Sequence, residues 1–126
     1  MRENILKIKS FKFAIRVVNL YKYLLEEKKE FVLSKQILRS GTSVGAMVRE
    51  AEHSESKVDF IHKMAIAQKE INETIYWLEL LCETKYISKK DFENINTDAT
   101  EIIKILTTTI KTAKKNITHY PPTINH

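Results

Sequence analysis

Residues 56–81, SKVDFIHKMAIAQKEINETIYWLELL, decide the fold. One face of this stretch carries mainly apolar side chains at helical spacing: Phe60, Met64, Ala67, Ile71, Ile75 or Thr74, and Leu78. A second apolar row widens that face: Ile61, Ala65, Ile75 and Leu81. Ser56, followed three residues later by Asp59, resembles a capping box, the pattern that starts a helix. The stretch therefore predicts a long α-helix that is buried across a broad face.

Three further helices are predicted around it. The first runs from Asn4 to about Lys29, and its expected core positions are Phe11, Ile15 or Ala14, Val18, Tyr21 and Leu25. The second begins near Ser34, an N-cap candidate, and its expected core positions are Ile37, Leu38, Val44, Met47, Val48 and Ala51. The fourth begins at Ser88, which repeats the capping pattern with Asp91; its expected core positions are Phe92, Ile95, Ala99, Ile102, Leu106, Ile110 or Thr109, and Ala113.

Almost nothing in the chain interrupts these helices. Its 126 residues include two glycines and two prolines, and both prolines, Pro121 and Pro122, lie near the end. Connections of a few residues force neighbouring helices to run antiparallel. We therefore expect an all-α, antiparallel up-down-up-down four-helix bundle, one domain over residues 1–115 followed by a C-terminal tail over 116–126.

Small and hydroxyl residues, Ser40-Gly41-Thr42-Ser43, stand in the middle of the second helix. The glycine alone weakens helix propensity by about 1 kcal/mol. Because small side chains let another backbone approach closely, the segment indicates either a tight helix crossing or a kink. We favour the crossing.

The formal charge of +5 is unevenly distributed. No acid occurs between Asn4 and Leu25, and Lys9, Lys12 and Arg16 fall at i, i+3 and i+7, on one helical face. Lys111, Lys114 and Lys115 make the end of the fourth helix basic as well. Such surfaces attract phosphates, although a solvated helix face is the simpler interpretation.

The single cysteine, Cys82, cannot form an internal disulfide, which favours a reduced, cytoplasmic protein. No apolar run approaches the roughly 18 residues needed to span a bilayer. We therefore expect no membrane association.

Two patterns raise the question of catalysis. Glu50 with His53, and Asp59 with His62, have the i, i+3 spacing of di-iron ligands, but both pairs flank one hairpin instead of lying in mid-helix. Arg49 and His53 approach the Arg-His motif of helical ribonucleases of the higher-eukaryote-and-prokaryote nucleotide-binding type, with too short an interval. Glycine-framed nucleophiles and phosphate-binding glycine loops are absent. We expect no enzyme activity, no metal site and no cofactor.

Polar residues beside the apolar rows of the third helix allow two interpretations. Glu70 and Glu73 lie one turn apart and belong either to a solvated face or to a contact between subunits, where charges specify register. Tyr76 and Trp77 are candidate anchors of the core or of the same contact.

Residues 34–87 resemble the four-helix-bundle proteins encoded in intervening sequences of bacterial 23S ribosomal RNA genes. The resemblance rests on 36-QILRSGTSV-44, 50-EAE-52, 56-SKVDFI-61, 65-AIA-67, 69-KE-70, 72-NET-74 and 76-YWLELL-81. The accessory variability determinant protein of diversity-generating retroelements is similar to the same family. The resemblance implies a non-enzymatic homopentamer around a central channel that binds nucleic acid through a basic surface. In the retroelement branch it also implies a reverse transcriptase as partner.

Together these observations favour a homo-oligomeric bundle that binds RNA or DNA. The residues expected to bind nucleic acid are Lys9, Lys12, Arg16, Lys111, Lys114 and Lys115, and those expected between subunits are Glu70, Glu73 and Trp77. A protein-interaction scaffold without nucleic acid, and the helical ribonuclease, remain the alternatives.

Overall fold

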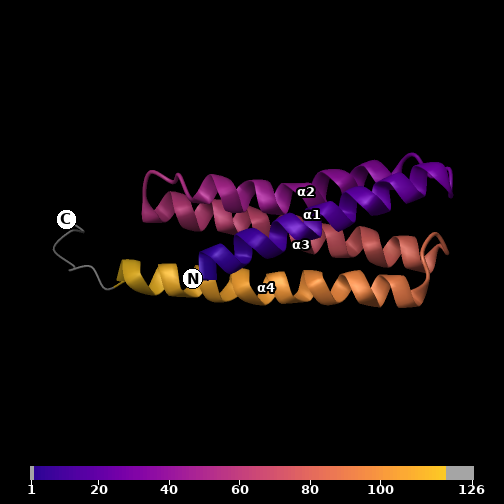
Figure 1. The fold of residues 1–126 in the computed structure, drawn as a ribbon. Coiled ribbons are helices and arrows are strands. Elements are labelled where there is room, and N and C mark those ends of the chain that lie inside the picture. The colour runs from indigo at the N-terminus through magenta and orange to yellow at the C-terminus, as the bar shows by residue number, and fades with distance from the viewer. Residues whose placement is uncertain (1, 119–126) are drawn as a thin grey trace.

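The computed structural model describes residues 2–118, which form four helices joined by short turns (Figure 1). Their bounds are Arg2–Glu26 (α1), Leu33–Ala51 (α2), Lys57–Glu83 (α3) and Lys89–Thr118 (α4). Contacts join α1 to α2, α2 to α3, α3 to α4, and α4 back to α1. The predicted all-α, up-down-up-down four-helix bundle is confirmed.

The ends of the bundle differ in detail from the expected boundaries. The first helix ends at Glu26, three residues before the predicted end. The expected boundary at residue 115 falls inside α4, which continues to Thr118. The rest of the expected tail, residues 119–126, lies outside the described residues. Within the described part of the chain, no helix is long and apolar enough to cross a membrane.

Three helices bury the apolar rows that the sequence predicted. The fully or nearly buried side chains include Ile37, Val44, Val48 and Ala51 on α2, Met64, Ala67, Ile71, Leu78 and Leu81 on α3, and Ile95, Ala99, Ile102, Leu106 and Ala113 on α4. The apolar residues form one stripe on α2 and on α4, and they spread over a broader face on α3. Periodicity therefore identified the buried face.

The prediction for α1 was wrong about which face enters the core. Phe11 and Ile15 are 51% and 47% exposed, whereas the buried positions are Leu6, Ser10, Phe13, Val17 and Leu24. This helix is apolar on two opposite faces, so periodicity alone could not choose between them. The choice is made by packing against α2.

That packing is the tight crossing expected at the small residues of α2. A Cβ added at Gly41 would lie 2.7 Å from Cγ2 and 2.8 Å from Cγ1 of Val17, and one added at Gly45 would lie 3.4 Å from the Ser10 carbonyl oxygen. Figure 1 shows α1 crossing the bundle obliquely, with its start beside α4 and its end beside α2. The crossing brings Ser10 and Val17 onto the two glycines and turns Phe11 and Ile15 outward.

The start of α2 is capped by a residue that the sequence did not suggest. Ser34, predicted as the N-cap, lies inside the helix, and its hydroxyl donates to the Glu30 carbonyl at 2.9 Å. Glu30 is 8% exposed, and its carboxylate accepts from the backbone N–H groups of Val32, Leu33 and Ser34 at 3.2, 3.0 and 2.7 Å. The positive end of the helix dipole also stabilises a carboxylate at this position.

The other two predicted helix starts are confirmed. The Ser56 hydroxyl accepts from the Asp59 N–H at 3.0 Å, and the Ser88 hydroxyl accepts from the Asp91 N–H at 3.0 Å. Each bond satisfies a donor in the first turn that has no partner within the helix. These caps fix the residues at which the α2–α3 and α3–α4 turns end and the next helix begins.

Candidate nucleic-acid interface

Two basic residues of α1 lie against acids of α4. Lys9 Nζ is 2.8 Å from Glu101 Oε1, and Arg16 donates to Asp98 Oδ2 at 2.6 Å and to Asn94 Oδ1 at 2.7 Å. These contacts tie α1 to α4. Part of the charge of Lys9 and Arg16 is therefore balanced within the chain, while Lys12, between them in the sequence, is exposed.

The end of α4 is basic without compensating acids in its own sequence. After Glu101 the helix contains Lys104, Lys111, Lys114 and Lys115, all exposed, and no Asp or Glu. Lys104, Lys111 and Lys115 follow at i, i+7 and i+11, so they share one helical face. Ile5 and Lys104 line the same shallow groove, which places this face beside the start of α1.

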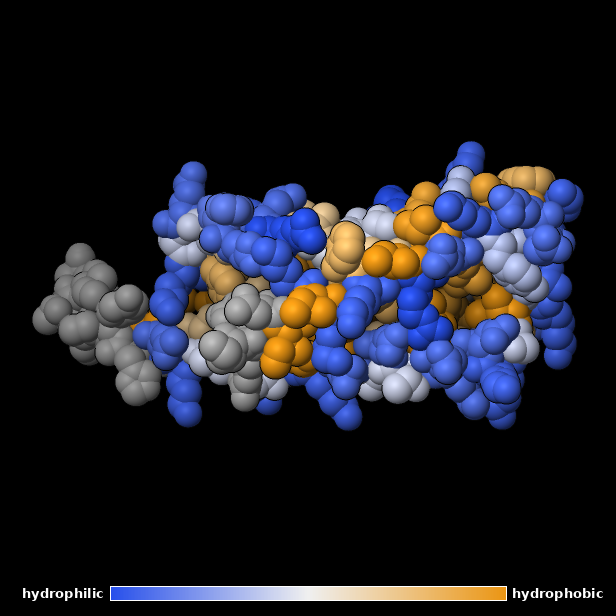
Figure 2. Space-filling model, viewed as in Figure 1, coloured by the Kyte–Doolittle hydropathy of each residue, from blue (hydrophilic) through white to orange (hydrophobic). Residues whose placement is uncertain are grey.

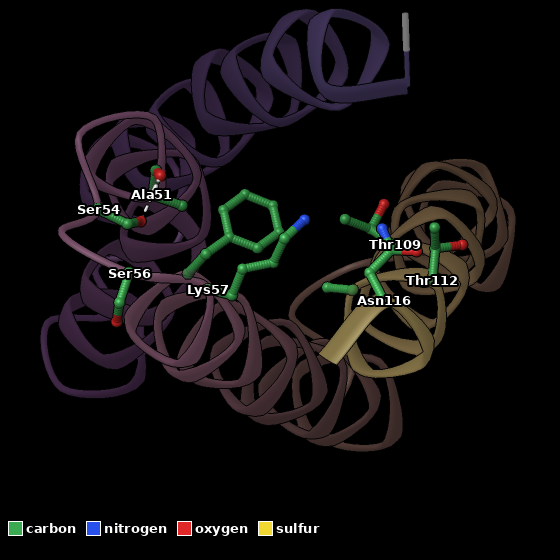
Figure 3. Close-up of a pocket in the computed structure, with 9 residues that line it drawn as sticks. Ala51, Ser54, Ser56, Lys57, Thr109, Thr112 and Asn116 are labelled. Atoms are coloured by element: carbon green, nitrogen blue, oxygen red, sulfur yellow. Dashed lines mark hydrogen bonds between the residues drawn. The ribbon is translucent and has the colours of Figure 1, made fainter. Parts of the chain in front are cut away.

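A cavity of about 360 Å³ lies at the same end of the bundle, between the α2–α3 turn and the last turns of α4 (Figure 3). Lys57 extends into it from the start of α3, opposite Thr109, Thr112 and Asn116 of α4. Its lining includes one ammonium group together with hydroxyl and amide groups. Lys57 therefore adds a positive charge to the end of the molecule that carries Lys111 and Lys114.

The residues expected between subunits lie in a network within the chain. Arg39 of α2 donates to Glu70 Oε1 at 3.3 Å and also contacts Glu73 Oε2. The same Glu73 oxygen accepts from Trp77 Nε1 at 3.0 Å. The network joins α2 to α3 and leaves Glu70 and Glu73 partly buried.

Several residues considered for catalytic or metal-binding roles make contacts with neighbouring residues of the chain. Asp59 accepts from Lys63 Nζ at 3.0 Å and from the Glu55 N–H at 3.2 Å. The hydrogen bond from Lys63 and that from the backbone hold the pKa of Asp59 below its usual value. Arg49 lies over the Phe11 ring, 5.0 Å from its centroid, and His53 is exposed in the following turn.

Metal ligands are not grouped in the described part of the chain. Among residues 2–118, no three His, Cys, Asp or Glu side chains lie close enough together to hold a metal ion. Glu50 and His53 are exposed at the end of α2, and His62 is exposed in the first turns of α3.

Known proteins resemble this chain in sequence and in helix arrangement. A family model described as "23S rRNA-intervening sequence protein" matches residues 2–108. The chain belongs to this family. A crystal structure of a protein of unknown function from the S23 ribosomal protein family of Bacteroides thetaiotaomicron is 60% identical, with a TM-score of 0.87. The similarity covers 88% of this chain and 99% of that one.

No curated protein matches the sequence. The match to the intervening-sequence family ends at residue 108, before Lys111, Lys114 and Lys115. Half of the six candidate basic residues therefore lie outside the part that the 23S rRNA-intervening sequence family model describes.

Three residues near the candidate sites were missed by sequence reasoning. Lys104 had a usable signal, because it continues the spacing of Lys111 and Lys115. Lys57 had none, since it stands among acids of the α2–α3 turn. Arg39 also had none, because its pairing with Glu70 and Glu73 depends on how α2 packs on α3.

Proposed function

We propose that this member of the 23S rRNA-intervening sequence family is a non-enzymatic homo-oligomer that binds RNA or DNA through its basic side chains. The observation that carries the proposal is the acid-free end of α4, where Lys111 and Lys114 are exposed beside Lys104. Lys12 and Lys115 complete the surface. Lys9 and Arg16 contribute with part of their charge balanced by Glu101 and Asp98.

The chemistry of this surface suits phosphates better than bases. Lysine ammonium groups are flexible point charges, which contact phosphate oxygens without fixing a base sequence. Binding of this kind releases condensed counterions and therefore weakens steeply with salt. We propose weak binding without strong sequence preference.

The homo-oligomer repeats this surface in every copy. Five copies, the number that the family resemblance implies, would present five sets of lysines to one nucleic acid. Such an assembly could also hold a nucleic-acid-processing partner, a reverse transcriptase if the protein acts in a retroelement.

The test is the salt dependence of binding to a short single-stranded RNA, measured by fluorescence anisotropy. We expect the logarithm of the association constant to fall linearly with the logarithm of salt concentration. Replacing Lys111 and Lys114 with alanine should reduce the slope by about 0.7 for each phosphate that the protein no longer neutralises.

Lys35→Ala is the matched control, because Lys35 is exposed on α2, outside the proposed surface. It should leave the slope unchanged. A flat salt response of the native protein, or an equal effect of Lys35→Ala, would contradict the proposal.

A further inference from the structure

The outward face of α1 is apolar. Ile8, Phe11 and Ile15 are 55%, 51% and 47% exposed and fall at i, i+3 and i+7, so they form one row on the side of α1 away from the core; Ile5 extends it toward the start of the helix. Figure 2 shows apolar side chains at the surface of the molecule along the line that α1 follows in Figure 1. Contiguous apolar side chains on a soluble bundle usually mark a contact with another molecule.

The charges on this row all have one sign. Lys12 and Lys22 lie on the same face as Ile8 and Ile15, and no acid occurs between Asn4 and Leu25. Arg49 of α2 adds a further positive charge over the Phe11 ring. A partner for this face should therefore combine exposed apolar or aromatic groups with acids.

The outward face of α3 has that composition. Tyr76 is 55% exposed, and its ring packs edge-on against Trp77 with the centroids 5.0 Å apart. Glu79 and Glu83 are exposed one and two turns further on. Glu70 and Glu73 are paired with Arg39 of α2, so the acids of this face are Glu79 and Glu83, and exposed Lys69 lies two turns before Tyr76.

The two faces point away from each other. Within residues 2–118, no Cα atom of α1 lies within 8 Å of a Cα atom of α3, and the end-on view of Figure 3 places the two helices at opposite corners of the bundle. They run in the same direction because two antiparallel steps separate them. Copies related by rotation about an axis along the bundle would therefore bring α1 of one copy beside α3 of the next with the same chain direction, and α1 would cross α3 at the oblique angle seen in Figure 1.

The spacing of groups along the two helices also agrees. Ile15 and Lys22 are seven residues apart, as are Tyr76 and Glu83, which is two turns or about 10 Å in both helices. In a parallel pair with Ile15 opposite Tyr76, Lys22 is opposite Glu83. Apolar contact and charge pairing then occur together.

We infer that the outward face of α1 binds the outward face of α3 of a second copy of this chain. The inference rests on the homo-oligomer part of the proposed function and assigns its contact surfaces. Because the two surfaces differ, the contact is heterologous, and a fixed rotation from copy to copy closes it into a ring. Lys12 then lies at the edge of a subunit contact.

Two variants, each disabling one surface, test the assignment. Ile15→Glu places a charged group opposite Tyr76, one turn before the acid Glu79, and Tyr76→Glu places an acid opposite the apolar row of α1. Light scattering should give each variant alone the mass of one chain, 14.7 kDa. An equimolar mixture should give two chains and nothing larger, because only one intact pair of surfaces remains.

Val32→Glu is the control, since Val32 is 70% exposed in the turn before α2 and lies on neither surface. It should keep the native mass, and circular dichroism should show that all three variants remain helical. Native mass in Ile15→Glu or Tyr76→Glu, or a mixture that stays at one chain, would overturn the assignment while the oligomer itself stands. A native protein with the mass of one chain would overturn both the assignment and the proposed homo-oligomer.

Discussion

Gly41 and Gly45 sit where α1 crosses α2, and they differ in how much room they leave. At Gly41 a Cβ would meet both methyl groups of Val17, whereas at Gly45 the nearest atom is the Ser10 carbonyl oxygen at 3.4 Å. Val17 is fully buried, and a β-branched side chain has few rotamers with which to yield. The glycine at 41 is therefore required by packing, while the one at 45 is close to ordinary contact.

We expect Gly41→Ala to destabilise the protein. Overpacking costs about 1–3 kcal/mol, which should outweigh the gain of roughly 1 kcal/mol in helix propensity. Gly45→Ala is the matched control and should leave the free energy of unfolding unchanged or raise it by up to about 1 kcal/mol. Urea unfolding of the two variants measures the difference. Equal stability of both would show that α1 can shift away from Gly41.

At the scale of the element, the start of α3 is held by a charged cap. Asp59 binds Lys63 one turn on and the Glu55 N–H before the helix, and these bonds lower its pKa from the ordinary value of 3.8. Asp59 in turn raises the pKa of Lys63. Since the carboxylate is favoured in the folded state, its stabilising effect is present above pH 4 and is lost as pH falls through the lowered pKa.

Asp59→Asn should therefore be less stable than the native protein near neutral pH, and the difference should shrink as the pH falls below 4. Free energies of unfolding at several pH values measure it. Lys63→Gln is the control, because it removes the main cause of the shift while keeping Asp59, and it should reduce the same pH dependence. A native–variant difference that persists undiminished at pH 2 would contradict this role of the carboxylate.

The helices also differ in how far their sequences determined their placement. A single apolar stripe identified the core face of α2 and of α4, and a broader apolar face that of α3, while serines marked the starts of α3 and α4. In α1 the row of Phe11 and Ile15 is as apolar as the row of Phe13 and Val17. The row of Phe13 and Val17 is the buried one because Val17 packs against Gly41. This contact joins residues that are distant in the chain.

The same limit applies to the candidate sites. The basic character of α1 and of the end of α4 was visible in the sequence, but the pairing of Arg16 with Asp98 depends on the packing of the first helix against the last. The cap at Glu30 escaped notice for a similar reason, because the carboxylate reaches forward to Val32, Leu33 and Ser34 through a turn whose shape the sequence did not indicate.

For the whole molecule, assembly and nucleic-acid binding should be coupled. If α1 of each copy contacts α3 of the next, Lys111 and Lys114 recur around the assembly, away from those contacts. A nucleic acid long enough to reach two copies then binds the second copy at a high effective concentration, which raises its affinity without any new contact. A nucleic acid that reaches one copy gains nothing.

Ile15→Glu should therefore weaken binding of a long single-stranded RNA, although every lysine of α4 is intact. A fall of about 100-fold is the lower range for the loss of multivalency, and the salt slope should fall with it because fewer phosphates are neutralised. Fluorescence anisotropy on long and short RNA separates the effects. The short RNA should bind the native protein and the variant equally, apart from the small contribution of the added acid. An equal loss on both RNAs would mean that Ile15 lies in the nucleic-acid surface itself, and unchanged binding of the long RNA would show that one copy suffices.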